Sequence, residues 1–146
     1  MLIGKYKYSV NSKTRICIPV KFREHLGKKC VVSKDLTYKC LNLYSTEQWK
    51  NYCEKIELLP SVEMEDVRFL IYMNSDESEI DQQGRTFLNQ QLCEDVGLLE
   101  EKEWMIVGVL NYIQIWSVSE WERFDKELNS AEKRQAVKNE LRKIGF

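Results

Sequence analysis

The feature that most constrains the fold is an internal repeat. Residues 8–19 (YSVNSKTRICIP) align with residues 78–89 (SEIDQQGRTFLN) at a constant offset of 70, so that Arg15 matches Arg85. A second block, 41–49, aligns with 113–121 at an offset of 72, which indicates a small insertion near residues 98–103. Two blocks repeated in the same order predict two copies of one structural unit. We therefore divide the chain into a first repeat, 1–74, and a second repeat, 75–146.

Each copy has the pattern strand, turn, strand, short helix, hairpin and longer helix. Alternation of polar with aromatic or apolar residues favours a first strand over 5–10, and Asn, Asp and Gly favour turns at 11–14 and 81–84. The return strands are expected at 15–18 and 85–88. The remaining predicted elements are helices over 20–26 and 90–96, a hairpin of 30–33 with 39–44, and a hairpin of 104–109 with 112–116.

Local signals at the ends of the helices support this pattern. Pro19 is suited to the start of the first helix and Gly27 to its end, while Asn89 and Gly97 play these parts in the second copy. Capping boxes then predict helices after residues 45 and 117. We interpret the aromatic residues of these two helices as part of the core.

Two further helical stretches fall outside the repeated unit, after residue 60 and over residues 131–143. The latter is amphipathic and highly charged. It is expected either to pack on a neighbouring molecule or to cover its own domain.

The net charge of −1 hides a strong asymmetry. Residues 1–40 contain ten Lys or Arg and two Asp or Glu, a sum of +8, whereas residues 41–146 sum to −9. Such asymmetry indicates nucleic acid or an acidic partner on the basic side. The alternative is an ordinary solvated lysine-rich face.

Residue types exclude several classes of function. The five cysteines include no C-x-x-C pair and the single histidine is His25, so a structural zinc site is not expected and the thiols should be reduced and mostly buried. A Cys–His nucleophile pair is not excluded by spacing alone, but no catalytic or phosphate-binding motif is present. We expect no enzyme activity, cofactor, metal or membrane span. The lack of a signal-peptide pattern indicates a cytoplasmic protein.

The order of these motifs resembles the MraZ family of bacterial transcription regulators. In the first copy the resemblance rests on residues 1–6, 11–15, 18–23 and Pro60, and in the second on 81–85 and 107–116. It extends over nearly the whole chain, to about Glu127. Each motif is short, but their order and their double occurrence are specific.

The resemblance implies an α+β, mostly β fold: a SpoVT/AbrB-like swapped-hairpin barrel formed by the two repeats as a pseudo-dimer within one chain, plus flanking helices. It also implies a homo-oligomeric ring that binds direct repeats in the promoter of the division and cell-wall gene cluster, usually as a repressor. The partner would be double-stranded DNA, and the protein would be nucleoid-associated. Direct DNA repeats require like-oriented binding faces, which a ring supplies.

The family's turn pattern, Asp-x-Lys-Gly-Arg, supplies the candidate DNA-binding residues. Arginine can bond bidentately to guanine or grip a phosphate, and lysines can add attraction that is independent of sequence. By position the candidates are Arg15, Arg85, Lys13, Gln83, Asn11 and Asp81, with Lys5, Lys7, Lys21 and Arg23 as phosphate contacts.

This chain departs from the family pattern in both turns. Asn11 and Thr14 replace Asp and Gly in the first turn, and Gln83 replaces Lys in the second. Because β-branched Thr tolerates positive φ poorly, the first turn is expected to differ in shape. We expect unequal halves, with the first repeat binding phosphate more strongly. Two alternatives stay open. In the first, the arginines have a purely structural role and tie down the turns by pairing with Asn11 or Asp81. In the second, the chain is a protein-interaction or antitoxin-like module with weak or lost DNA binding.

Overall fold

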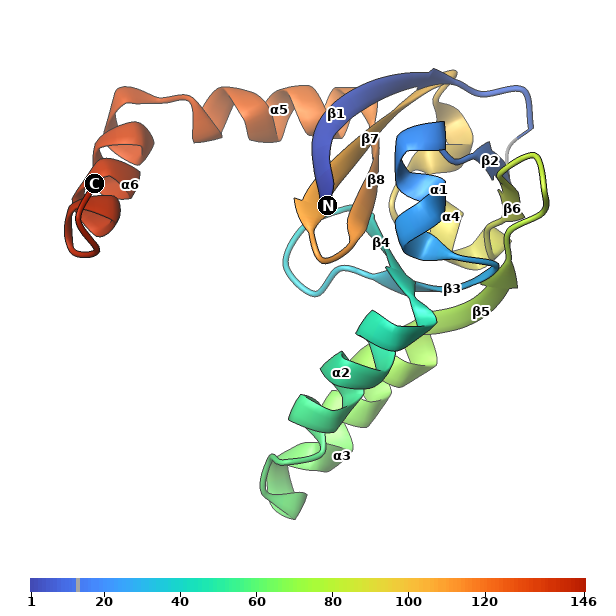
Figure 1. The fold of residues 1–146 in the computed structure, drawn as a ribbon, viewed down its shortest axis with the longest axis horizontal. Helices are drawn as coiled ribbons and strands as arrows, with labels where there is room; N and C mark the ends of the chain where they lie inside the picture. The colour runs from blue at the N-terminus through green and yellow to red at the C-terminus, as the bar shows by residue number, and fades with distance from the viewer. Residues whose placement is uncertain (13) are drawn as a thin grey trace.

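The computed structural model describes residues 1–12 and 14–146 and has an α+β fold, as predicted (Figure 1). The first repeat forms β1 (Leu2–Ser9), β2 (Arg15–Cys17), α1 (Val20–Leu26), β3 (Lys29–Lys34), β4 (Leu41–Ser45), α2 (Thr46–Ile56) and α3 (Ser61–Ile71), followed by the short 3₁₀ helix η1 (Tyr72–Asn74). The second forms β5 (Ser75–Glu79), β6 (Arg85–Phe87), α4 (Gln90–Asp95), η2 (Leu98–Glu100), β7 (Glu103–Leu110), β8 (Ile113–Ser117), α5 (Val118–Leu128) and α6 (Ala131–Arg142).

Six strands form one antiparallel sheet in the order β1-β7-β8-β4-β3-β5. The hairpins β3–β4 and β7–β8 lie at its centre and each belongs to one repeat. The outer strands are exchanged, because β1 of the first repeat pairs with β7 of the second, and β5 of the second pairs with β3 of the first. Neither repeat completes its own sheet, which confirms the swapped pseudo-dimer.

The remaining strands, β2 and β6, form a separate two-stranded ribbon between the repeats. It is extended by two matching backbone bonds, from Ile18 N to the Gly84 oxygen (2.7 Å) and from Leu88 N to the Thr14 oxygen (2.6 Å). Among the described residues the strands therefore form two sheets, and β1 and β5 are the edges of the larger one.

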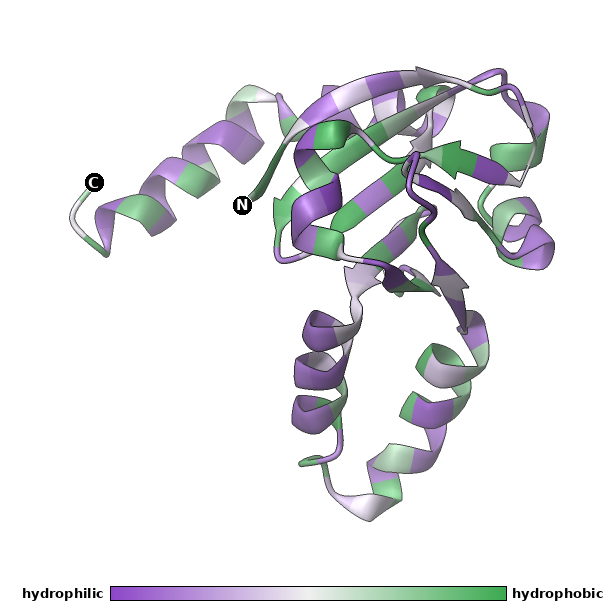
Figure 2. Ribbon diagram, turned by 45° about the vertical axis from the view of Figure 1, so that its right-hand side comes forward, coloured by the Kyte–Doolittle hydropathy of each residue, from purple (hydrophilic) through white to green (hydrophobic). Residues whose placement is uncertain are grey.

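The main core lies between the sheet, the ribbon and the short helices α1 and α4. Trp104, Phe22 and Ile16 are fully buried there, and both repeats contribute residues to this core. Figure 2 shows the apolar residues concentrated within this body, with polar residues along its outer helices. Because each repeat buries its apolar face against the other, the core is shared.

The sequence signals for the short helices are confirmed. Helix α1 spans the predicted residues and ends at Gly27, whose φ of 77° favours glycine. Helix α4 is capped by Asn89, whose side chain accepts a bond from Leu92 N at 3.1 Å. The predicted serine caps of α2 and α5 accept bonds from the third residue beyond them.

The longer helices form two arms that project from the body (Figures 1 and 2). In the first arm, Met64 and Ile71 of α3 are buried in a cluster with Ile56 of α2. In the second arm, α6 turns away from α5 and has no buried residue, so Val137 and Leu141 are exposed. Helix α6 thus does not cover the body of this chain. Within the described residues, no helix is long and apolar enough to cross a membrane.

Candidate nucleic-acid interface

The β2–β6 ribbon brings the two repeated arginines onto one outward face. Its pairing places Arg15 opposite Phe87 and Cys17 opposite Arg85. Side chains alternate across a strand, so the central pair, Ile16 and Thr86, points inward and is at most 1% exposed. The outward face therefore consists of Arg15, Cys17, Arg85 and Phe87, and we refer to these four residues as the ribbon face.

The turn before Arg85 is organised by the side chain of Asp81. Its Oδ1 accepts the backbone N–H groups of Gln83 and Arg85, both at 2.9 Å, and its Oδ2 accepts the Nε–H of Arg85 at 3.0 Å. These bonds, the Arg85 backbone bond foremost, lower the pKa of the Asp81 carboxyl below its ordinary value. Gly84 completes the turn with a φ of 80°.

The turn before Arg15 differs in sequence. Lys13 lies outside the described residues, and Thr14 stands where the second turn has Gly84. Arg15 makes no ion pair with any described residue, and its guanidinium lies over the Phe87 ring at 5.7 Å from the centroid. Asn11 is exposed and does not bond Arg15. The tie between turn and arginine therefore exists at Asp81–Arg85 and has no equivalent between Asn11 and Arg15.

A shallow hollow of about 440 Å³ adjoins the ribbon face. It is lined by Arg15 and Arg85 together with Lys28, Lys29, Glu79, Asp81, Ile80 and Phe87. Four cationic and two anionic side chains give this lining a net charge of +2. Cationic side chains beside an exposed two-stranded ribbon are suited to a polyanion, because a β-ribbon can enter the major groove while lysines contact the phosphates.

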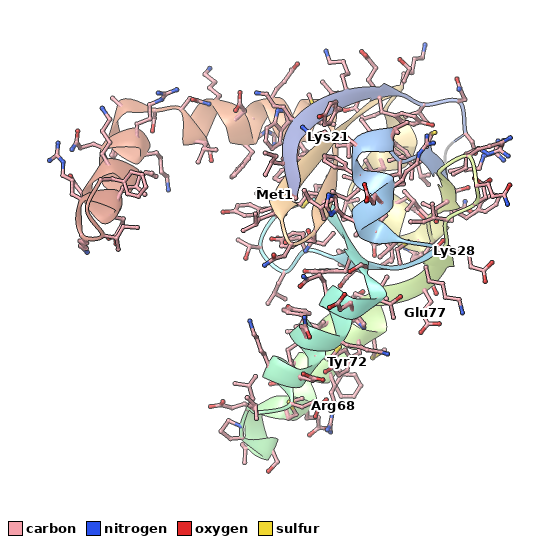
Figure 3. All side chains as sticks on the ribbon, viewed as in Figure 1. Met1, Lys21, Lys28, Arg68, Tyr72 and Glu77 are labelled. Carbon is pink, nitrogen blue, oxygen red and sulfur yellow. The ribbon has the colours of Figure 1, made fainter. Side chains whose placement is uncertain are left out.

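The other predicted cations lie in several places. Lys21 is exposed on α1, and Lys28 lies beyond the C-terminal end of that helix (Figure 3). Lys5 and Lys7 are exposed on β1, and Lys5 Nζ lies 5.9 Å from the centroid of the Trp121 ring of α5, so these two lysines are not part of the ribbon face.

Two polar candidates contact the ribbon from its end. Gln83 is exposed at the tip of the second turn, where its backbone oxygen lies 3.5 Å from Cys17 Sγ. Arg23 is half-buried, and its guanidinium bonds the Ile18 oxygen and Cys17 Sγ.

Sequence reasoning missed several residues of this region, among them Phe87, Lys28 and Lys29. Phe87 lies at the end of β6 and is 65% exposed. The alternation in Arg85-Thr86-Phe87 could have placed it beside Arg85. No local signal could have placed the two lysines beside Arg85, because they come from the other repeat.

Two interleaved repeats, each exchanging its outer strand and contributing one strand to a central ribbon, define the class of SpoVT/AbrB-like swapped-hairpin proteins. Comparison with known families agrees with this class. A sequence model of the family described as "MraZ protein, putative antitoxin-like" matches residues 1–70 and again residues 71–143.

Curated relatives support the same assignment. The chain is 38% identical to "Transcriptional regulator MraZ" of Caldanaerobacter subterraneus over 86% of this chain and 87% of that protein. It is 39% identical to the protein of that name in Acetivibrio thermocellus, over 88% and 90% of the two chains. The namesake in Alkaliphilus oremlandii is 34% identical over the full length of both. The chain belongs to the MraZ family.

Proposed function

We propose that this protein is a sequence-specific, double-stranded-DNA-binding transcriptional regulator that acts from the cytoplasm on the nucleoid. The relatives' name, transcriptional regulator, supports this function. The observation that carries it is the ribbon face, where the half-buried Arg15 and the exposed Arg85 occupy repeat-related positions on one outward face. By resemblance to its family, its target is the promoter of the division and cell-wall gene cluster, and its effect is repression.

The two arginines have different parts in this proposal. Arg15, which no carboxylate of the described residues holds, is the stronger contact for a guanine edge or a phosphate. Arg85 presents its remaining N–H groups from a turn already fixed by Asp81. Lys13, Asn11 and Gln83 belong to the same two turns. The exposed Lys21 adds attraction to the DNA phosphates that is independent of base sequence, whereas Lys5 and Lys7 lie on β1, away from the ribbon face.

We also propose that copies of the chain assemble into a closed ring that binds direct repeats. The two edges of the sheet are unlike, because β1 carries Lys5 and Lys7 whereas β5 has the acidic sequence SDESE. Edges of opposite charge favour head-to-tail contacts, and such contacts close into rings when the rotation permits. Light scattering tests this: a ring gives one discrete oligomer, and a monomer at micromolar concentration contradicts it.

A salt titration tests DNA binding itself. Fluorescence anisotropy is measured with a labelled duplex from upstream of the protein's own gene and with random DNA of equal length. Affinity for the upstream duplex is expected to exceed that for random DNA and to fall linearly with salt on a logarithmic plot, because phosphate contacts release counterions. Equal affinity for both duplexes would show that the protein is not a sequence-specific regulator.

Variants relate this binding to the ribbon face. Arg15→Ala and Lys13→Ala are expected to weaken binding to the upstream duplex, whereas Arg68→Ala is the matched control. Arg68 lies on the α2–α3 arm near Tyr72 (Figure 3) and forms an exposed ion pair with Glu57 at 3.4 Å. The alternative function, an antitoxin-like or interaction module, predicts that neither duplex binds and that a protein partner is retained instead.

A further inference from the structure

The side chain of Arg23 lies directly on the second turn, although it belongs to the first repeat. It reaches from α1 to Gly84, where the guanidinium occupies the space that a β-carbon would need. Residues 23 and 84 are 61 positions apart in the chain, so this contact joins the two repeats. Glycine at this position therefore serves two needs, a positive φ of 80° and room for the Arg23 guanidinium.

Hydrogen bonds fix Arg23 in this position. Its Nε–H donates to the Ile18 oxygen at 2.8 Å, and its Nη2–H group lies 3.3 Å from Cys17 Sγ. Ile18 in turn donates its own N–H to the Gly84 oxygen at 2.7 Å. The guanidinium, the end of β2 and the turn thus form one closed set of contacts. Bonds from a charged group in a half-buried position are worth more than ordinary surface bonds.

We propose that Arg23 is a positioning residue for DNA recognition: it holds the Asp81–Arg85 turn of the other repeat so that Arg85 faces the DNA. The inference rests on the proposed DNA-binding function. It gives Arg23 a different role from the phosphate contact expected from sequence, because its Nε–H and Nη2–H groups are already bonded to the Ile18 oxygen and Cys17 Sγ. Arg23 acts through Gly84 and Ile18, and Arg85 makes the contact.

The contact of Arg23 with Gly84, which we call the brace, has no counterpart in the sequence of the first turn. At the repeat offset of 70, Arg23 corresponds to Cys93, which is fully buried, and Gly84 corresponds to Thr14. The first turn therefore has neither the arginine nor the glycine that receives it. This asymmetry predicts that loss of Arg23 affects the contribution of Arg85 and leaves that of Arg15 unchanged.

The DNA-binding test separates positioning from phosphate contact. Arg23→Gln is expected to weaken binding to the upstream duplex a few-fold, and by no more than Arg85→Ala does, with affinity for random DNA and the salt slope both unchanged. A phosphate contact instead predicts weaker binding to both duplexes and a slope smaller by about 0.9. That result would overturn the proposal. In an Arg85→Ala background, Arg23→Gln is expected to have no further effect, and an additive loss would contradict it.

A second readout needs no DNA. Hydrogen exchange of Gly84 and Arg85, whose N–H groups bond Asp81, is expected to accelerate about tenfold in Arg23→Gln and less in Arg23→Lys, because the brace protects the turn. Unchanged exchange would overturn the brace. If the wild type fails to bind the upstream duplex while exchange accelerates as expected, the proposed function fails and the structural brace stands.

Gly84→Ala tests the receiving side, with Gly97→Ala as its control. Gly97 has a φ of 76° but its added β-carbon would meet only the flexible end of Lys39, at 3.5 Å. Both variants bear backbone strain, and only Gly84→Ala displaces Arg23. Gly84→Ala is therefore expected to reproduce the Arg23→Gln loss of specific affinity. Equal effects of the two glycine variants on specific affinity would contradict the proposal.

Discussion

Arg15 of the first repeat lies across the central ribbon from Phe87 of the second, with its guanidinium 5.7 Å from the ring centroid. The ring is 65% exposed, so one face supports the cation while the rest remains open to solvent. This contact holds Arg15 without neutralising it. Arg85, by contrast, is paired with the Asp81 carboxylate at 3.0 Å.

Replacing Phe87 is expected to weaken DNA binding through Arg15. An exposed cation–π contact is worth about 0.5–1 kcal/mol, so Phe87→Leu should reduce affinity for the upstream duplex about two- to fivefold. Phe87→Tyr retains the ring and should bind as the wild type does. Anisotropy titration of both variants checks this, and equal losses for Leu and Tyr would show that the ring does not support Arg15.

The two arginines are expected to contribute unequally. Arg15→Ala should cost about tenfold or more in affinity, because it removes a cation that pairs with no carboxylate among the described residues. Arg85→Ala should cost less, because its charge is already balanced by Asp81. Mobility shifts of the two variants at one salt concentration measure the difference. A larger loss for Arg85→Ala would reverse our assignment of the stronger half.

Acid is expected to loosen the second turn before the rest of the fold. The Asp81 bonds favour the ionised carboxylate and lower its pKa, so their stabilising effect is complete above about pH 4, the ordinary aspartate value. It is lost as pH falls through the lower pKa of the folded state. The difference in free energy of unfolding between the wild type and Asp81→Asn should therefore shrink as pH falls from about 4 through the lower pKa of the folded state. A difference constant over that range would contradict this role.

The five thiols are expected to fall into two reactivity groups. Burial raises the pKa of Cys30 to about 11 and of Cys93 to about 12, and it also raises that of Cys40, so these three stay protonated at pH 8. Cys17 and Cys53 are only half-buried, although burial also raises the pKa of Cys53. Alkylation followed by mass spectrometry should modify these two in the native protein and the other three only in denaturant. Equal native rates at all five would contradict the buried assignment.

The two repeats are expected to unfold together. Ile16 is fully buried beneath the ribbon, where it pairs with Thr86 of the other repeat, so Ile16→Ala should destabilise the whole protein by about 2–5 kcal/mol. Circular dichroism and tryptophan fluorescence in urea should report a single coincident transition. Two separate transitions would indicate that 1–74 and 75–146 are independent folding units.

Local structure could be predicted because its signals are local. The first short helix begins after Pro19 and ends at Gly27, and both residues act through their own backbone preferences. Alternation likewise located the strands. It could not show that β2 pairs with β6, since alternation determines which face of a strand is buried but not which strand lies beside it; here only the family resemblance indicated an exchange.

The site was predictable only in part for the same reason. Arg15 and Arg85 were found through the repeat, whereas the contact of Arg23 with Gly84 depends on a packing arrangement between repeats. The sequence also did not predict that α3 and α6 would differ in their packing. Both helices follow the last helix of their repeat's common unit, but α3 packs on α2 through Met64 and Ile71 while α6 keeps Leu141 exposed.

The most direct measurement of the central claim is a mobility shift with DNA from upstream of the protein's own gene, comparing the wild type, Arg15→Ala and Arg68→Ala. If the ribbon face binds DNA, Arg15→Ala loses about tenfold or more in affinity while Arg68→Ala, which removes the same charge from the α2–α3 arm, binds like the wild type. Equal binding by Arg15→Ala and the wild type, or equal losses in both variants, would contradict the claim.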